Sequence, residues 1–203
     1  GHRAGTVRHL LAGADLCHHG QVGAAGAVGG IVGQISKLRG SRVIGIAGGK
    51  AKCEYVTKEL GFDACLDYKT GNLFENLRAA APKGVDVYWD NVGGEITDMA
   101  LAQANTFARF VVCGMISQYN ATEAYGLKNY RSVLVNRIKM QGMIVFDWAA
   151  RYPEAWSQLG EWVTSGQIKY RETIADGLQS APRAFVGLLK GENVGKQLVR
   201  LNA

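Results

Sequence analysis

The stretch Gly23-Ala24-Ala25-Gly26-Ala27-Val28-Gly29 opens an apolar segment that continues through Ile35. Glycines recur at every third position, and a glycine turn of this kind lets the backbone approach a pyrophosphate closely. The helix that follows offers free N–H groups and the positive end of its dipole. Close packing of two elements also favours a Gly/Ala-rich helix start. The rest of the chain has to distinguish these two interpretations.

Predicted strands and helices alternate after this turn. Strands are expected at 42–47, 64–66, 85–90, 109–114 and 143–146, and helices at 27–38, 50–60, 72–81, 95–104 and 128–139. This alternation is typical of βαβ units and predicts a parallel, doubly wound sheet of the Rossmann α/β class. Ligands bind such sheets at the carboxyl edge, where the loops 23–29, 47–49, 90–94 and 114–117 are expected. The pattern favours a dinucleotide site.

The chain changes character after Phe146. An amphipathic helix is expected at 153–164, with its large apolar side chains facing inward, namely Trp156, Leu159, Trp162 and Val163. Residues 168–174 alternate like an antiparallel strand with one wet face. A helix at 182–189 and a last strand at 195–201 follow. The predicted units are an irregular segment 1–22, a dinucleotide-binding domain 23–166 and a C-terminal unit 167–203.

Residues 1–22 do not fit this pattern. They contain all four histidines, and 17–21 is a poor match to the buried central strand that the fold requires before Gly23. The abrupt change motivates the hypothesis that this segment is a truncated or frame-shifted reading of a longer gene. The His18-His19 pair has no Cys or carboxylate partner at ligand spacing, so no metal site is expected.

Composition narrows the class of protein. The net charge is +6 in 203 residues, but Lys and Arg are dispersed and accompany no nucleic-acid motif. No apolar run is long enough to cross a bilayer, and the N-terminus does not resemble a signal peptide. The four scattered cysteines fit a reduced, cytoplasmic protein and lack zinc-site spacing. We expect neither a nucleic-acid nor a membrane partner.

The end of the second predicted strand indicates which dinucleotide binds. NAD-selective sites carry Asp or Glu about twenty residues beyond the glycine turn. Here the strand ends in Ala47-Gly48-Gly49-Lys50-Ala51-Lys52, with two cations and no carboxylate. A lysine attracts a 2′-phosphate that a carboxylate would repel. We predict NADP(H), with Lys52 as the main phosphate contact; the alternative is a pair of solvated lysines.

With these residues in view, the chain resembles the zinc-independent medium-chain dehydrogenase/reductases over residues 23–203. It is most similar to the group of leukotriene B4 12-hydroxydehydrogenase, prostaglandin reductase and curcumin reductase. Besides the glycine turn, the resemblance is carried by Leu60-Gly61-Phe62-Asp63, Asp67-Tyr68-Lys69-Thr70, Asp90-Asn91-Val92-Gly93-Gly94 and the segments 113–120 and 191–196. The resemblance implies an oxidoreductase that transfers a hydride from NADPH to the C=C bond of an α,β-unsaturated ketone or aldehyde.

The resemblance also implies a set of cofactor contacts. Those at the pyrophosphate are Gly23, Ala25, Gly26, Ala27, Val28 and Gly29, and those at the 2′-phosphate end are Lys52 and Tyr68. Those nearer the nicotinamide are Asn91, Cys113, Gly114, Met115, Ile116, Ser117, Tyr119, Met143, Ile144, Val145 and, from the tail, Asn193. Tyr119 is the candidate catalytic residue, because its hydroxyl would stabilise a developing oxyanion without a metal. The alternative is that Tyr119 only orders its loop.

The resemblance further implies an N-terminal catalytic domain that has almost no counterpart in this sequence. The tail 167–203 would then be a remnant of that GroES-like domain and is expected to expose apolar surface. Two other functions stay open: an NADPH-binding fragment without activity, and a quinone reductase, which would lack the loop 116–120. Superfamily members often pair through the cofactor domain, so a homodimer with 143–146 at the contact edge is expected by analogy.

Overall fold

The computed structural model describes residues 18–201. Within that range, one six-stranded parallel sheet has the order β3-β2-β1-β4-β5-β6. The strands are β1 (His18–Val22), β2 (Arg42–Ala47), β3 (Ala64–Asp67), β4 (Val85–Asp90), β5 (Ala104–Val112) and β6 (Lys139–Gly142). The strand order reverses between β1 and β4, the switch point at which doubly wound sheets bind dinucleotides. The predicted Rossmann fold is confirmed.

Strand β1 corrects the expectation that 17–21 would make a poor central strand. It lies between β2 and β4 and is parallel to both. Backbone pairing on both sides satisfies the N–H and C=O groups that burial would otherwise leave unpaired. At its middle the buried Gly20 packs under Val85 and Tyr88, each 3.4 Å from where a Cβ would stand. Residues 18–22 therefore continue directly into the glycine turn, while the predictions for 1–17 lie outside the described residues.

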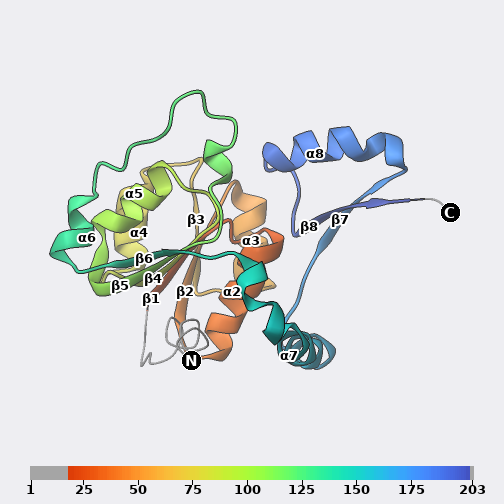
Figure 1. Cartoon of the computed structure of the whole chain (residues 1–203), viewed down its shortest axis with the longest axis horizontal. Coiled ribbons are helices and arrows are strands. Elements are labelled where there is room, and N and C mark those ends of the chain that lie inside the picture. The colour runs from red at the N-terminus through yellow and green to blue at the C-terminus, as the bar shows by residue number, and fades with distance from the viewer. Residues whose placement is uncertain (1–17, 202–203) are drawn as a thin grey trace.

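Two pairs of helices cover the sheet. They are α2 (Ala27–Leu38) and α3 (Lys50–Lys58), and α4 (Leu73–Ala80) and α5 (Glu95–Ala102). Figure 1 shows the second pair on the other side of the sheet from the first. Successive side chains of β2 point to opposite faces of the sheet and join a hydrophobic core on each. Val43 packs with residues of α3, and Ile44 packs with residues of α4 and α5. The sheet is thus buried on both faces, as parallel sheets usually are.

Helix α2 lies unusually close to its neighbours. A Cβ at Gly33 would stand 1.9 Å from Cζ of Phe62, and one at Gly30 would stand 3.2 Å from Cδ1 of Leu60. Only glycine leaves room for this approach. The packing therefore brings the N-terminus of α2 directly over the end of β1.

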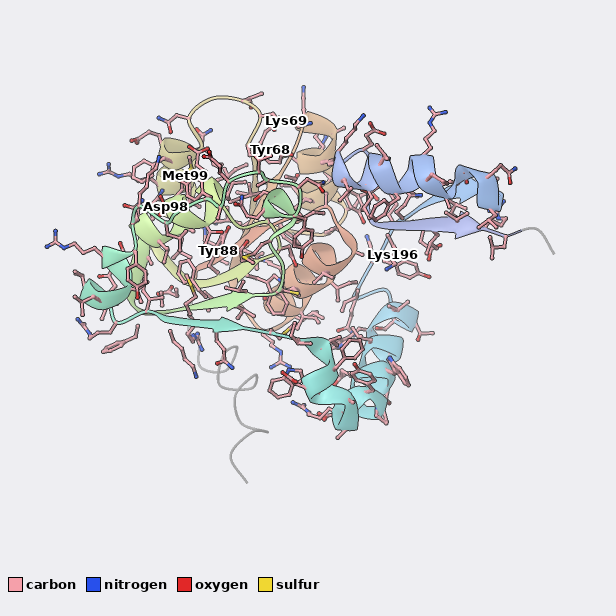
Figure 2. All side chains as sticks on the ribbon, turned by 45° about the horizontal axis from the view of Figure 1, so that its top comes forward. Tyr68, Lys69, Tyr88, Asp98, Met99 and Lys196 are labelled. Atoms are coloured by element: carbon pink, nitrogen blue, oxygen red, sulfur yellow. The ribbon has the colours of Figure 1, made fainter. Side chains whose placement is uncertain are left out.

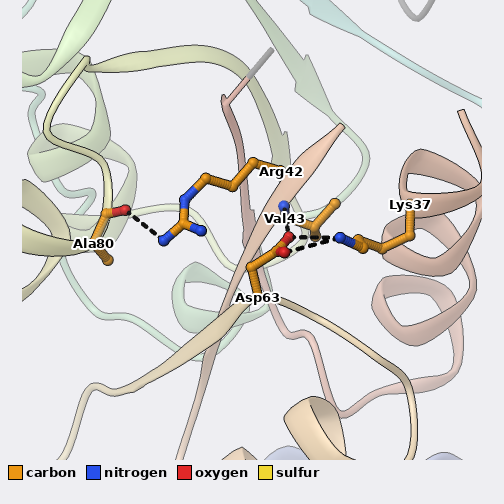
Figure 3. Close-up of polar contacts among 5 residues, drawn as sticks. All are labelled: Lys37, Arg42, Val43, Asp63 and Ala80. Carbon is orange, nitrogen blue, oxygen red and sulfur yellow. Dashed lines mark hydrogen bonds and ion pairs between the residues drawn. The ribbon is translucent and has the colours of Figure 1, made fainter. Parts of the chain in front are cut away.

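Asp63 connects three elements on the amino-terminal side of the sheet. Its carboxylate accepts hydrogen bonds from the Lys37 ammonium at 2.9 Å and from the backbone N–H of Val43 at 2.7 Å (Figure 3). In the same view Arg42 donates to the carbonyl of Ala80 at 3.3 Å. Partial burial raises the pKa of Asp63, but the Lys37 and Val43 hydrogen bonds outweigh it and leave the pKa below its usual value. These contacts align α2, β2 and α4.

The region after β5 differs from the prediction. The expected helix at 128–139 is a short α6 (Arg131–Val135) followed by β6, and the expected strand at 143–146 runs instead into a 3-10 segment, η2 (Val145–Arg151). The chain reverses at Arg137, which has a positive φ of 50°. Asn136 braces the turn, accepting from Phe107 N–H at 2.7 Å and donating to the carbonyl of Ala104 at 3.0 Å. The position of β6 is set by its pairing with β5, which no local sequence pattern indicates.

Helix α7 (Tyr152–Thr164) follows η2, and the tail then holds β7 (Glu172–Asp176), α8 (Ala181–Leu189) and β8 (Lys196–Arg200). Strands β7 and β8 pair with each other in parallel, so the antiparallel expectation is wrong. The inward-facing prediction for α7 is wrong for Trp156, which is 69% exposed, and for Val163, which is also exposed, whereas Leu159 and Trp162 are half-buried. No helix of the described part is long and apolar enough to cross a membrane.

The tail is fastened to α2, to the end of α3 and to the glycine turn. Gln34 pairs with both backbone groups of Lys169, each at 2.8 Å. Arg171 forms an ion pair with Glu59 at 2.9 Å and lies over the ring of Tyr55. Gly195 donates its N–H to the carbonyl of Ala25 at 2.7 Å. The last contact brings the tail onto the glycine turn.

Candidate cofactor-binding site

The glycine turn is closed by its own backbone. Gly23 has a φ of 72°, which L side chains rarely adopt, and Gly26 donates its N–H to the carbonyl of Gly23 at 2.9 Å. A Cβ at Gly26 would stand 3.1 Å from that carbonyl oxygen. No side chain caps α2, and its first turn holds no acidic residue. The turn therefore offers backbone N–H groups and the positive end of the helix dipole to a ligand in front of the N-terminus of α2.

A cavity of about 1210 Å³ extends from this turn along the carboxyl edge of the sheet. Twelve predicted site residues line it, namely Gly23, Ala25, Gly26, Ala27, Val28, Gly29, Lys52, Tyr68, Asn91, Ile116, Ser117 and Asn193. The lining residues come from distant elements: Figure 2 labels Tyr68 after β3, Met99 on α5 and Lys196 at the start of β8. The cavity is large enough for a ligand of dinucleotide size.

Tyr68 and Lys52 stand at one end of this cavity. The Tyr68 hydroxyl lies 2.7 Å from where a Cβ of Gly48 would be, so the ring rests on the β2–α3 loop. Asp67 joins the two loops by accepting from Gly49 N–H at 2.8 Å and from Lys69 N–H at 3.0 Å. Partial burial, and then the neighbouring Lys69 charge, lower the pKa of Lys52. An anion bound here would favour the charged ammonium and so oppose this lowering of the pKa.

The Lys52 ammonium also reaches the tail. It donates a hydrogen bond to the carbonyl of Gly191 at 2.6 Å, across 139 positions of sequence. Gly191 follows α8 and lines the cavity, as does Asn193, whose side chain donates to the carbonyl of Gly195 at 2.8 Å. The tail thus forms one wall of the site.

The turn after β4 is held by a buried carboxylate. Asp90 is 1% exposed and accepts from the N–H groups of Val92 at 2.9 Å and Gly93 at 2.8 Å, and from the Thr97 hydroxyl. Three such bonds satisfy a charge that would otherwise be costly to bury. Asn91, the next residue, is thereby kept at the cavity wall.

The loop after β5 is tied to this same turn. Cys113 and Gly114 donate their N–H groups to the carbonyl of Asp90 at 2.8 and 3.1 Å. Of the predicted residues in this loop, Ile116 and Ser117 line the cavity, whereas Cys113, Gly114, Met115 and Tyr119 do not. The Tyr119 hydroxyl accepts from Met115 N–H at 3.4 Å, and the side chain is 63% exposed. In this structure Tyr119 therefore orders its loop, and the catalytic role stays a prediction.

The segment 143–145 also lies outside the cavity lining. Met143 donates its N–H to the carbonyl of Val112 at 2.9 Å and packs against Trp89 and Val111. Ile144 is 59% exposed and Val145 is 53% exposed. Their predicted contacts to the carboxamide stay predictions.

Several residues that line the cavity could not be predicted from the sequence, among them Tyr125. Tyr125 donates its hydroxyl hydrogen to Asp98 at 3.3 Å, and Asn129 N–H donates to the same carboxylate at 2.8 Å. These bonds fasten the loop between η1 (Ile116–Gln118) and α6 to α5, where Figure 2 shows Asp98 and Met99. The other unpredicted lining residues include Ile96, Met99, Gln118, Lys190 and Lys196.

The described residues offer no metal centre: within 18–201 no group of three or more His, Cys, Asp or Glu could hold a metal ion. Cys53, Cys65 and Cys113 are free thiols in this range. Burial is the main cause that raises the pKa of each, so these thiols stay protonated at neutral pH.

Comparisons with known proteins agree with this geometry. Residues 27–165 match the family model described as zinc-binding dehydrogenase. The chain is 47% identical over 184 residues to NADPH-dependent curcumin reductase of Escherichia coli (strain K12), covering 88% of this chain and 53% of that protein. It is 45% identical over 180 residues to prostaglandin reductase 1 of Rattus norvegicus, covering 87% and 54% respectively. The chain spans about half the length of these curated relatives.

Solved structures give the same result. CurA from Vibrio vulnificus in complex with NADPH superposes with a TM-score of 0.91 at 43% identity, over 97% of this chain and 60% of that one. A quinone oxidoreductase of Escherichia coli complexed with NADPH superposes with a TM-score of 0.79 at 23% identity, a likeness of fold alone.

Proposed function

The chain belongs to the zinc-binding dehydrogenase family, and we propose that it binds NADPH and serves the reduction of the C=C bond of α,β-unsaturated ketones or aldehydes. One observation carries the proposal: a single cavity is lined by the glycine turn, Lys52 and Tyr68. The relatives named NADPH-dependent curcumin reductase, prostaglandin reductase 1 and, at 41% identity, 2-alkenal reductase (NADP(+)-dependent) of Nicotiana tabacum support this substrate class.

The residues of the cavity fit this cofactor. We assign the pyrophosphate to the backbone of 23–29, because the turn is closed by its own hydrogen bond and lines the cavity at the N-terminus of α2. We assign the 2′-phosphate to Lys52 and Tyr68, because a half-buried ammonium beside another lysine is stabilised by a dianion. Asn91, Ile116, Ser117 and Asn193 would orient the remainder. Bound NADPH would supply the hydride.

The substrate side of the proposal rests on Tyr119. Its hydroxyl oxygen accepts from Met115 N–H, so its own hydrogen remains to be donated to an oxyanion that develops on the substrate carbonyl. The family's description implies zinc, but the described residues do not fit a zinc ion. The proposal therefore assigns no step to a metal.

A fluorescence titration with NADPH, followed by an NADPH-oxidation assay with an enone and with a quinone, tests the function. We expect NADPH binding and oxidation that depends on the enone. Oxidation with the quinone alone would support a quinone reductase instead, and absence of NADPH binding would refute the proposal. Tyr119→Phe should lower enone turnover without changing NADPH affinity; unchanged turnover would remove Tyr119 from the chemistry.

A second candidate is an NADPH-binding unit that does not turn over. Two observations favour it: Tyr119 lies outside the cavity lining, and the tail exposes Leu178 (70%), Phe185 (60%) and Leu201 (65%). Such exposed apolar side chains are typical of a surface that another domain or chain covers. This agrees with assigning 167–203 to a second domain. NADPH binding without oxidation of either substrate would support this candidate.

We also propose a homodimer and a cytoplasmic location. Strand β6 is one of the two edge strands of the sheet, the other being β3, so its outer backbone groups can pair with a second copy. This edge replaces the segment 143–146 of the sequence-based expectation. The free thiols among the described residues favour a reducing compartment. Light scattering that gives the mass of a monomer would contradict the dimer.

A further inference from the structure

The tail places one more cation at the glycine turn. We propose that Lys196 binds the pyrophosphate of the dinucleotide through its ammonium group. The inference rests on the proposed function, since it names a further contact within the same cavity.

The position of Lys196 is set by the glycine before it. Gly195 N–H donates to the carbonyl of Ala25 at 2.7 Å, and Gly195 forms a parallel β-bridge with Gly26. Gly195 has a φ of 70°, and a Cβ there would stand 1.8 Å from the carbonyl oxygen of Arg171. Only glycine fits this crossing. Lys196 therefore directly follows the residue that is bridged to Gly26, the N-cap of α2.

The backbone of Lys196 is fixed while its side chain is free to bind. Its N–H donates to the carbonyl of Arg171 at 2.9 Å, which anchors the start of β8. Its side chain is exposed and lines the cavity (Figure 2). Glu172 is its partner in register on β7, yet among the described residues the Lys196 ammonium has no ion pair.

The charges around the cavity favour an anion at this point. Three lysines line it, Lys52, Lys190 and Lys196, against a single carboxylate, Glu95. Lys52 stands after β2 and is bonded to Gly191, so it serves the far end of a bound dinucleotide. The backbone of the glycine turn supplies partial charges only. Lys196 supplies the full positive charge that a doubly negative pyrophosphate lacks there.

The pyrophosphate is common to NADPH and NADH, whereas the 2′-phosphate is present in NADPH alone. Lys196→Gln should therefore raise the Kd of both cofactors by the same factor, about tenfold, because a charge-assisted hydrogen bond is lost. Lys196→Arg should keep both Kd values close to those of the unchanged chain. The readout is a fluorescence titration of each cofactor against the full chain.

Lys83→Gln is the matched control. It removes the same charge from an exposed loop before β4, at the amino edge of the sheet and away from the cavity. Its Kd values should be unchanged. A Lys196→Gln chain that binds both cofactors as tightly as the control would overturn the inference, as would a loss confined to NADPH. If the unchanged chain binds neither cofactor, the proposed function itself fails.

Discussion

Lys52 illustrates how one residue can serve both the fold and the site. Its ammonium bonds to the carbonyl of Gly191 at 2.6 Å and at the same time lines the cavity beside Tyr68. An ammonium has three donors, so the bond to Gly191 leaves two for a phosphate. The absence of a carboxylate at this position predicted the preference for NADP(H) from the sequence, but the link to the tail had no local signal.

At this scale we predict that Lys52→Gln separates the two cofactors. Loss of a charge-assisted bond to the 2′-phosphate should weaken NADPH binding by about tenfold or more, while NADH binding changes little. Parallel titrations with NADPH and NADH provide the measurement. Lys50→Gln is the control, because Lys50 lies on the same helix with its side chain 90% exposed. Equal NADPH affinity in Lys52→Gln and Lys50→Gln would contradict the assignment.

Among the elements, α2 depends most on small residues. Its glycines let the helix lie against Phe62 and Leu60, and this contact holds the helix N-terminus at the end of β1. The sequence predicted α2 correctly, since a Gly/Ala-rich segment with an apolar repeat is typical of a helix packed on a sheet. It did not predict β1, because five residues without an apolar pattern become a central strand only through pairing with β2 and β4.

Gly33→Ala should destabilise the fold strongly. The new methyl group would stand 1.9 Å from Cζ of Phe62, so the helix or the ring must move, at a cost of about 1–3 kcal/mol of unfolding free energy. Urea unfolding measures the change. In Gly160→Ala the added Cβ meets nothing within 4 Å, and the better helix former should raise stability by about 0.5–1 kcal/mol. Equal stability of both variants would show that α2 tolerates displacement.

Across the whole molecule, a few long-range contacts decide where the tail lies. Gln34, 4% exposed on α2, makes a backbone-like pair with Lys169, 135 positions away. Arg171 and Gly195 add the contacts to α3 and to the glycine turn. The tail consequently closes one side of the cavity instead of extending into solvent.

Gln34→Leu should loosen this attachment. The substitution leaves the N–H and C=O of Lys169 without their partner, which should cost about 1–3 kcal/mol and speed hydrogen exchange between 165 and 173. Native-state hydrogen exchange followed by mass spectrometry measures this segment. Gln158→Leu on the exposed face of α7 is the control and should leave the exchange unchanged. Unaltered exchange in Gln34→Leu would mean that Arg171 and Gly195 suffice to hold the tail.

Local sequence patterns were enough for the alternation of strands and helices, the parallel sheet and the glycine turn, because hydrophobic period and glycine placement act over a few residues. They failed where partners lie far apart: β1, the true position of β6 and the parallel pairing of β7 with β8 follow from backbone pairing between distant segments. The cavity shows the same division. The sequence predicted that 23–29 and Lys52 line its proposed phosphate end, whereas Lys196 and Tyr125 reach the wall only because long-range hydrogen bonds place Gly195 at Ala25 and Tyr125 at Asp98.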